Sequence, residues 1–179
     1  MSIEQLAKQS RERMHGSLAS VDTALLRQMR DSALRSCFRR MDETAHRMEH
    51  VATIHGKEYI NDAAARSVNA TLYTMQNITG PVVWIAMAAD DLANYTPLQP
   101  IALRKVDMLI CVGGHTQALH KAFGSLLPRV VDVDDIATAV KVAALSAVEG
   151  SRIIFSPATP QGDPTEQEAR QFIHQVNEL

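Results

Sequence analysis

The chain has 179 residues, of which 46% are hydrophobic and 21% charged, with a formal net charge of −2 at pH 7. These values are typical of a globular protein with one main domain; they exclude a disordered chain and argue against general attraction to nucleic acid. No stretch approaches the ~20 apolar residues of a membrane span, and the N-terminus lacks the apolar core of a signal peptide. We therefore expect a cytoplasmic protein that binds neither nucleic acid nor membranes.

The first forty residues are predicted to be helical. Apolar residues share one helical face over residues 3–14, and a second stripe recurs every four residues from Val21 to Cys37, with Asp22 as a candidate N-cap. Residues 1–43 are thus expected to form a helical N-terminal extension. Its apolar face needs a partner, either the rest of the chain or another chain, so we expect a protein partner or self-association through residues 1–43.

From residue 44 onward the pattern predicts strands that alternate with helices. Alternation over residues 48–54, a turn at Gly56–Lys57 and the pair Tyr59–Ile60 indicate a hairpin-like pair of strands. Short runs rich in Val and Ile predict buried parallel strands, and one shorter run predicts a strand nearer an edge. The buried runs are residues 81–87, 108–112 and 152–155, and the edge run is 129–133.

Helical patterns lie between these strands, at residues 68–75, 98–105, 118–123 and 136–147, and a final helix is introduced by Asp163 and Pro164. This order predicts an α/β domain over residues 44–179, with a Rossmann-like, mostly parallel sheet and helices on both faces.

Metal-binding residue types occur, but their spacing does not favour a metal site. Cys37 and Cys111 match no metal or disulfide pattern, and we interpret both as reduced thiols that pack like small apolar residues. His46, His50 and His55 suggest a metal site only if they lie on a helix. On a strand, His46 and His50 would share a face but lie about 13 Å apart. We therefore expect no metal.

Ligands of open α/β sheets bind at the carboxyl ends of the strands. Three segments end strands here. Asp90 and Asp91 follow residues 81–87, with a helix cap or plain solvation as the alternative, and the turn at residues 111–116 offers backbone N–H groups to an anion, with close backbone packing as the alternative. The third is Asp62, followed by three alanines and Arg66. Neither a P-loop nor a G-x-S-x-G motif occurs, so we expect no catalytic residue and no cofactor.

From about Ser32 onward, the chain resembles the C-terminal domain of the Mur ligases, specifically the ATP-dependent type that adds D-glutamate to UDP-N-acetylmuramoyl-L-alanine. Three stretches carry the resemblance: HRMEHVATIHGKEYINDAAARSVNATLYTM, GPVVWIAMAADDLANYTPLQPI and GSRIIFSPATPQGD. It implies an α/β domain that lacks the uridine-nucleotide domain and the central P-loop domain of such ligases.

The resemblance implies roles residue by residue. Arg47 stands in the retained His-Arg-φ-Glu signature, whose arginine contacts the nucleotide, and Asp62 survives in the second signature. There the family's lysine and threonine positions are Ala64 and Arg66. The third signature's lysine, which helps to bind the incoming amino acid, is replaced by Asp91.

In the fourth signature, which begins at Ser156, Gln161 replaces a substrate-binding serine. Arg47 and Asp62 are therefore expected to be vestigial nucleotide contacts. The altered ligand cleft is expected to hold Arg66, Asp90, Asp91, Ser156 and Gln161.

These substitutions remove the groups that D-glutamate requires, because its two carboxylates need cations and hydroxyls to replace water. Ala64 supplies no hydrogen bond, and Asp91 would repel the ligand. We expect a stand-alone, non-catalytic remnant of the ligase domain that acts as a binding or assembly module linked to peptidoglycan precursor metabolism. The alternatives are the C-terminal half of a split ATP-dependent amide ligase and a sensor of small anionic ligands that uses Arg66.

Overall fold

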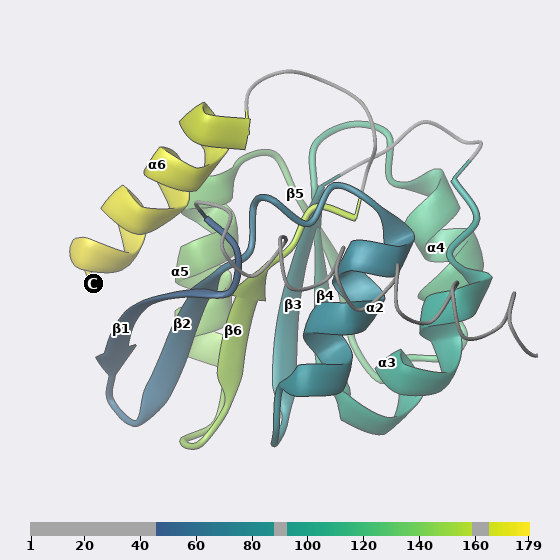
Figure 1. Cartoon of the computed structure of the whole chain (residues 1–179), viewed down its shortest axis with the longest axis horizontal. Coiled ribbons are helices and arrows are strands. Elements are labelled where there is room, and N and C mark those ends of the chain that lie inside the picture. Colours follow the sequence, from purple (N-terminus) through teal and green to yellow (C-terminus); the bar gives the residue numbers. More distant parts are fainter. Residues whose placement is uncertain (1–45, 88–92, 159–164) are drawn as a thin grey trace, which may run out of the picture. The chain divides into compact units, whose positions relative to one another are not determined.

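The computed structural model describes residues 46–87, 93–158 and 165–179 (Figure 1). All of them belong to the compact unit from Thr44 to Leu179. The predicted helical extension, residues 1–43, lies outside the described residues. So do Asp90, Asp91 and Gln161, and the predicted start of the last helix at Asp163 and Pro164.

The chain enters the sheet through an antiparallel hairpin, as predicted. Strand β1 (Glu49–Ile54) pairs with β2 (Lys57–Asn61). The turn lies at His55 and Gly56, one residue earlier than expected, with φ angles of 49° and 70°. Two left-handed residues are what a tight two-residue hairpin turn requires, and glycine adopts this conformation at little cost.

The remaining strands are parallel, and the most buried of them form the centre of the sheet. They are β3 (Val82–Met87), β4 (Val106–Val112), β5 (Val130–Val133) and β6 (Arg152–Phe155). The order across the sheet is β1-β2-β6-β3-β4-β5, with parallel pairing from β2 to β5. The Val- and Ile-rich runs predicted as buried strands occupy the middle, and β5 lies at the edge, as expected.

Helices cover both faces of the sheet, which confirms the predicted fold class (Figure 1). Helices α2 (Val68–Asn77), α3 (Gln99–Lys105) and α4 (Gln117–Phe123), with a short 3-10 turn (Thr96–Leu98), pack on one face. Helices α5 (Ile136–Ser146) and α6 (Thr165–Asn177) pack on the other.

Each face has its own aromatic packing. On the α2 side, Trp84 meets Phe123 edge to face with ring centroids 5.4 Å apart, and on the α6 side Phe155 stacks on Phe172 at 5.4 Å. These four rings are fully buried, so each helical layer is fixed to the sheet by large apolar contacts. None of the helices within the described ranges is long and apolar enough to span a membrane.

Candidate functional site

Three segments meet at the carboxyl ends of β2 and β6. Because β2 and β6 are parallel neighbours with Asn61 opposite Phe155, the next residues of each strand, Asp62 and Ser156, lie side by side. The backbone N–H of Asp62 donates to the carbonyl of Phe155 at 2.8 Å. Helix α2 begins after Ser67, whose hydroxyl accepts from the third helical N–H, and runs back over this edge.

Asp62 is completely buried, and each of its two carboxylate oxygens accepts two hydrogen bonds. Oδ1 accepts from Nη1 of Arg47 at 2.5 Å and from the backbone N–H of Met48 at 3.2 Å. Oδ2 accepts from the hydroxyls of Thr74 at 2.7 Å and Ser156 at 3.0 Å. Burial raises the pKa of Asp62 above its ordinary value, and Arg47 and the other three donors offset part of that rise.

The Arg47 side chain is also buried and also bonds only to groups of this domain among the contacts described. Its side chain is only 1% exposed, and besides Asp62 it donates through Nη2 to the carbonyl of Ala70 at 2.9 Å. Its guanidinium also lies 5.7 Å from the centre of the Tyr73 ring. Helix α2 therefore covers the ion pair: the carbonyl of Ala70 accepts from Arg47, and the hydroxyl of Thr74 donates to Asp62.

We call Arg47, Asp62, Thr71, Thr74 and Ser156 the buried polar cluster. Ser156 connects its parts, because its hydroxyl also lies 2.9 Å from that of Thr71 and its carbonyl accepts from the indole N–H of Trp84 at 2.8 Å. Sequence reasoning singled out Arg47, Asp62 and Ser156 but missed the two threonines. Their signal was two hydroxyls three residues apart on an otherwise apolar helix face.

The alanines after Asp62 are packing residues. Ala63 and Ala65 are fully buried, and the backbone of Ala65 accepts a hydrogen bond from Ala158 at 3.0 Å. The backbone N–H of Ala64 donates to the carbonyl of His46 at 3.1 Å. The turn thus joins the segment before β1 to the segment after β6, and methyl groups fit this enclosed space.

Arg66 is half-buried just before α2, and its charge acts on one acidic side chain of α6. Its positive charge lowers the pKa of Glu168 on α6, although burial raises that pKa further, so the net pKa of Glu168 lies above its ordinary value. Of the five residues predicted for the ligand cleft, only Arg66 and Ser156 are described. The structure encloses Ser156 in the buried polar cluster and leaves Arg66 partly accessible.

Two expectations from the sequence need correction. His46 precedes β1 with a φ of 58°, so it is not on the strand; its Nδ1 contacts Glu49 at 2.9 Å, while His50 contacts Thr53. In the turn at residues 111–116, close packing does not explain Gly114, because a Cβ there would meet nothing within 4 Å. Gly113 is explained by its φ of 99°, which disfavours other residues.

A hollow of about 410 Å³ lies between the 3-10 turn and α4, where no site was predicted. The side chains with polar groups in its lining are those of Asn94, Tyr95, Thr96, Gln99 and Lys121. The side-chain amide of Gln99 already donates a hydrogen bond to the carbonyl of Ala122 at 2.8 Å, so it is less available to a ligand. The hollow therefore offers one cation and two small polar groups, which are suited to a weakly held anion.

No family model matches the chain. Sequence comparison finds relatives among enzymes named UDP-N-acetylmuramoylalanine–D-glutamate ligase. That of Porphyromonas gingivalis is 31% identical over 163 residues, which are 91% of this chain and 36% of the relative. That of Bacteroides fragilis is 30% identical over 100% of this chain and 41% of the relative. The chain thus spans about two-fifths of the length of these curated relatives, and they confirm the expected resemblance.

Solved structures share the fold at low identity. A murein peptide ligase from Psychrobacter arcticus has a TM-score of 0.53 at 13% identity and is matched over 75% of this chain and 30% of its own. Escherichia coli FolC in complex with ADP has a TM-score of 0.53 at 14% identity, over 75% of this chain and 32% of its own. A ligase domain from Haemophilus ducreyi has a TM-score of 0.51 at 10% identity, over 73% of this chain and 99% of its own.

Proposed function

We propose that this chain, a homologue of the UDP-N-acetylmuramoylalanine–D-glutamate ligases with the α/β fold of Mur ligase C-terminal domains, is a non-catalytic binding or assembly module. The observation that carries the proposal is the enclosure of the buried polar cluster. Arg47 and Asp62, the two retained signature residues that were expected to contact a nucleotide, bond to each other and to the domain's own core.

A ligand would have to compete with this internal bonding. Each oxygen of Asp62 already accepts from two donors, and the Arg47 side chain is 1% exposed. Breaking one partner away from a buried ion pair costs about 3–5 kcal/mol, because the other charge stays buried and unpaired. This cost supports a structural role for both residues.

The surroundings of the turn support the same conclusion. A dicarboxylate such as D-glutamate needs convergent cations and hydroxyls to replace its water. Ala63 and Ala65 present buried methyl groups, and Ala64 has no polar side-chain atom. Among the described residues of this turn, Arg66 is the single cation, and Glu168 already offsets part of its charge.

The 179 residues contain no P-loop motif, and phosphoryl transfer from ATP requires a phosphate cradle and a held Mg²⁺. Ligase activity would therefore need a P-loop domain in addition to these residues. The C-terminal half of a split ATP-dependent amide ligase is the second candidate, favoured by the intact His46–Glu49 signature. It predicts co-purification with a P-loop protein.

The anion-sensor alternative is weakened by Glu168, the acidic neighbour of Arg66.

The first test is thermal unfolding of the full chain with and without Mg-ATP, Mg-ADP, D-glutamate and UDP-muramoyl precursors. A ligand at a hundred times its Kd stabilises the fold by about 2.7 kcal/mol, which would raise the Tm by about 5–10 °C. We expect no such shift. A shift with nucleotide would contradict the module and favour the split enzyme. A shift with an anionic ligand that Arg66→Ala abolishes would favour the sensor.

Assembly is tested through the N-terminal segment. We propose that residues 1–43 mediate self-association or hold a protein partner in the cytoplasm. Deletion of these residues should then lower the oligomeric state measured by sedimentation velocity, or abolish co-purification of the partner. A truncated protein with the same oligomeric state and the same partners as the full chain would rule out this segment as the assembly element.

A further inference from the structure

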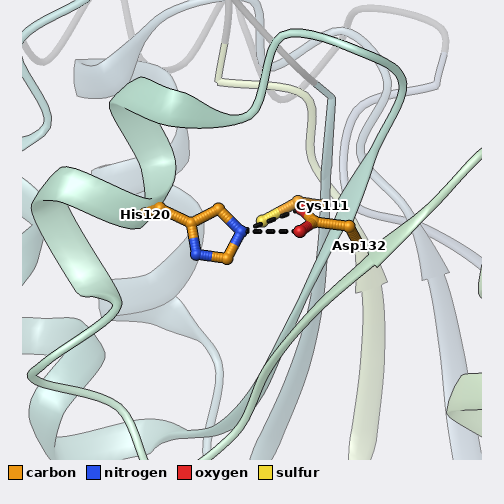
Figure 2. Close-up of side chains that lie close together, drawn as sticks. All are labelled: Cys111, His120 and Asp132. Atoms are coloured by element: carbon orange, nitrogen blue, oxygen red, sulfur yellow. Dashed lines mark hydrogen bonds and ion pairs between the residues drawn. The ribbon is translucent and has the colours of Figure 1, made fainter.

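Three chemically distinct ligand groups meet near the carboxyl edge of the sheet, away from every residue singled out for the ligase site. Cys111 on β4 and Asp132 on β5 are paired across the two strands, so their side chains project from the same face. Helix α4 packs over that face and carries His120 (Figure 2). The ligand atoms of the three residues all lie within 4.8 Å of one another.

The three ligand atoms face one another. Nε2 of His120 lies 2.9 Å from each carboxylate oxygen of Asp132, and Figure 2 shows that the same edge of the imidazole faces the sulfur of Cys111. Cys111 is fully buried, whereas the side chains of His120 and Asp132 are 39% and 52% exposed. The buried sulfur of Cys111 thus lies next to two side chains that solvent reaches.

We propose that Cys111, His120 and Asp132 bind a divalent transition metal ion of the Zn²⁺ or Co²⁺ type, with water completing the coordination. One thiolate, one imidazole and one carboxylate are a donor set that suits Zn²⁺ and does not suit Mg²⁺ or Ca²⁺, which prefer oxygen ligands alone. Bonds of about 2.0–2.3 Å to a tetrahedral ion place ligand atoms about 3.3–3.7 Å apart. Small side-chain rotations would bring this cluster to that spacing.

A nucleophile–histidine–aspartate triad fits the geometry less well. In such a triad, the two ring nitrogens serve different partners, one the nucleophile and the other the carboxylate. Here the same edge of His120 faces both Cys111 and Asp132. Burial, together with the nearby Asp132 carboxylate, raises the pKa of the Cys111 thiol to about 12, so the metal-free thiol is protonated and a poor nucleophile.

Metal binding would change this protonation state without any redox step. The Cys111 thiol gives up its proton to solvent as the sulfur–metal bond forms, and the cation neutralises the repulsion between thiolate and Asp132. The site is independent of the proposed function, because it shares no residue with the buried polar cluster.

The test is titration of the full chain with Co²⁺, followed by displacement with Zn²⁺. We expect one Co²⁺ per chain, with the near-ultraviolet charge-transfer band of a Co²⁺–thiolate bond, and loss of that band when Zn²⁺ is added. Cys111→Ala should abolish the band. His120→Gln and Asp132→Asn, at accessible positions that should tolerate the change, should each weaken Co²⁺ binding about tenfold or more.

Two nearby exposed residues provide matched controls. His115→Gln and Asp134→Asn change the same residue types without touching the cluster, and should leave Co²⁺ affinity within about twofold of the unaltered chain. Binding without a thiolate band would overturn the proposal and leave a surface His120–Asp132 ion pair above a core cysteine. Equal losses in the control variants would also overturn it.

Discussion

Asp62 and Arg47 form the buried ion pair on which the carboxyl edge of the sheet depends. Asp62→Asn should lower the free energy of unfolding by about 3–5 kcal/mol, because Arg47 would remain buried without a counter-charge. Urea denaturation at pH 7 measures this. The exposed Asp107→Asn is the control and should change stability by no more than about 0.5 kcal/mol.

The pairing itself is tested by a double-mutant cycle with Arg47→Met. Each single change leaves an unpaired charge or acceptor, whereas the double change removes both charges, so it should cost less than the two single changes together. Additive losses would show that the two side chains do not stabilise each other, and would remove the main support for the proposed function.

Glu168 offers a pH-dependent prediction at the same scale. Its pKa is raised in the folded protein, so the fold favours the protonated acid. The stability that this protonated form contributes is fully present below the unfolded pKa and is lost as pH rises through the folded value. Glu168→Gln should therefore be more stable, relative to the unaltered chain, at pH 7 than at pH 4. Urea unfolding at the two pH values measures it, and an unchanged difference between them would contradict a raised pKa.

Motif comparison singled out the residues Arg47, Asp62 and Ser156, but it did not predict that Arg47 and Ser156 both bond to Asp62. The sequence placed Arg47 and Asp62 in separate signatures fifteen positions apart. Their contact depends on left-handed backbone at His46 and Met48, with φ angles of 58° and 49°, and sequence patterns rarely reveal such a conformation at non-glycine residues. A satisfied internal pair and an open nucleotide contact therefore look alike in sequence.

Among the elements, α2 depends on a lysine from another helix. Its last turn contains no basic residue, and Lys105 at the end of α3 donates to the carbonyls of Met75 at 2.7 Å and Ile78 at 2.5 Å. Unsatisfied carbonyls at a helix end favour such a cation. The lysine thus stabilises the helix that covers the buried polar cluster.

Lys105→Met should lower the free energy of unfolding by about 1–3 kcal/mol, because it keeps most of the apolar stem and removes charge-assisted hydrogen bonds. Thermal unfolding measures the loss. Lys141→Met on the exposed surface of α5 is the matched control. A loss no larger than in this control would mean that water serves these carbonyls equally well.

Most elements could be predicted because their signals are local. Buried parallel strands are continuous Val- and Ile-rich runs, and β3, β4 and β6 appear where those runs predicted them. The hairpin turn moved by one residue because His55 adopts the left-handed conformation beside Gly56, which a glycine-centred prediction does not anticipate. Within the described ranges, the secondary structure was therefore accessible from sequence to within a residue or two at the ends.

At the scale of the whole molecule, the order of the strands was beyond the sequence patterns. Strand β6 lies between β2 and β3, so Ser156 reaches Asp62 across 94 positions of chain. The Cys111, His120 and Asp132 cluster arises in the same way, from three elements that only the fold brings together. The spacing of residues in the sequence cannot predict these contacts, because they depend on the order of the strands and on which face each helix covers.

The two cores of the described residues predict that residues 44–179 fold without the N-terminal segment. Both faces of the sheet are covered by helices from within this range, and the largest buried rings pack against one another. The fragment should unfold in one cooperative transition, with an enthalpy near Tm of roughly 95 kcal/mol at about 0.7 kcal/mol per residue. Differential scanning calorimetry of the fragment, compared with the full chain, measures this. A broad transition with a much smaller enthalpy would mean that residues 1–43 complete one of the cores, and the predicted boundary at residue 43 would then be wrong.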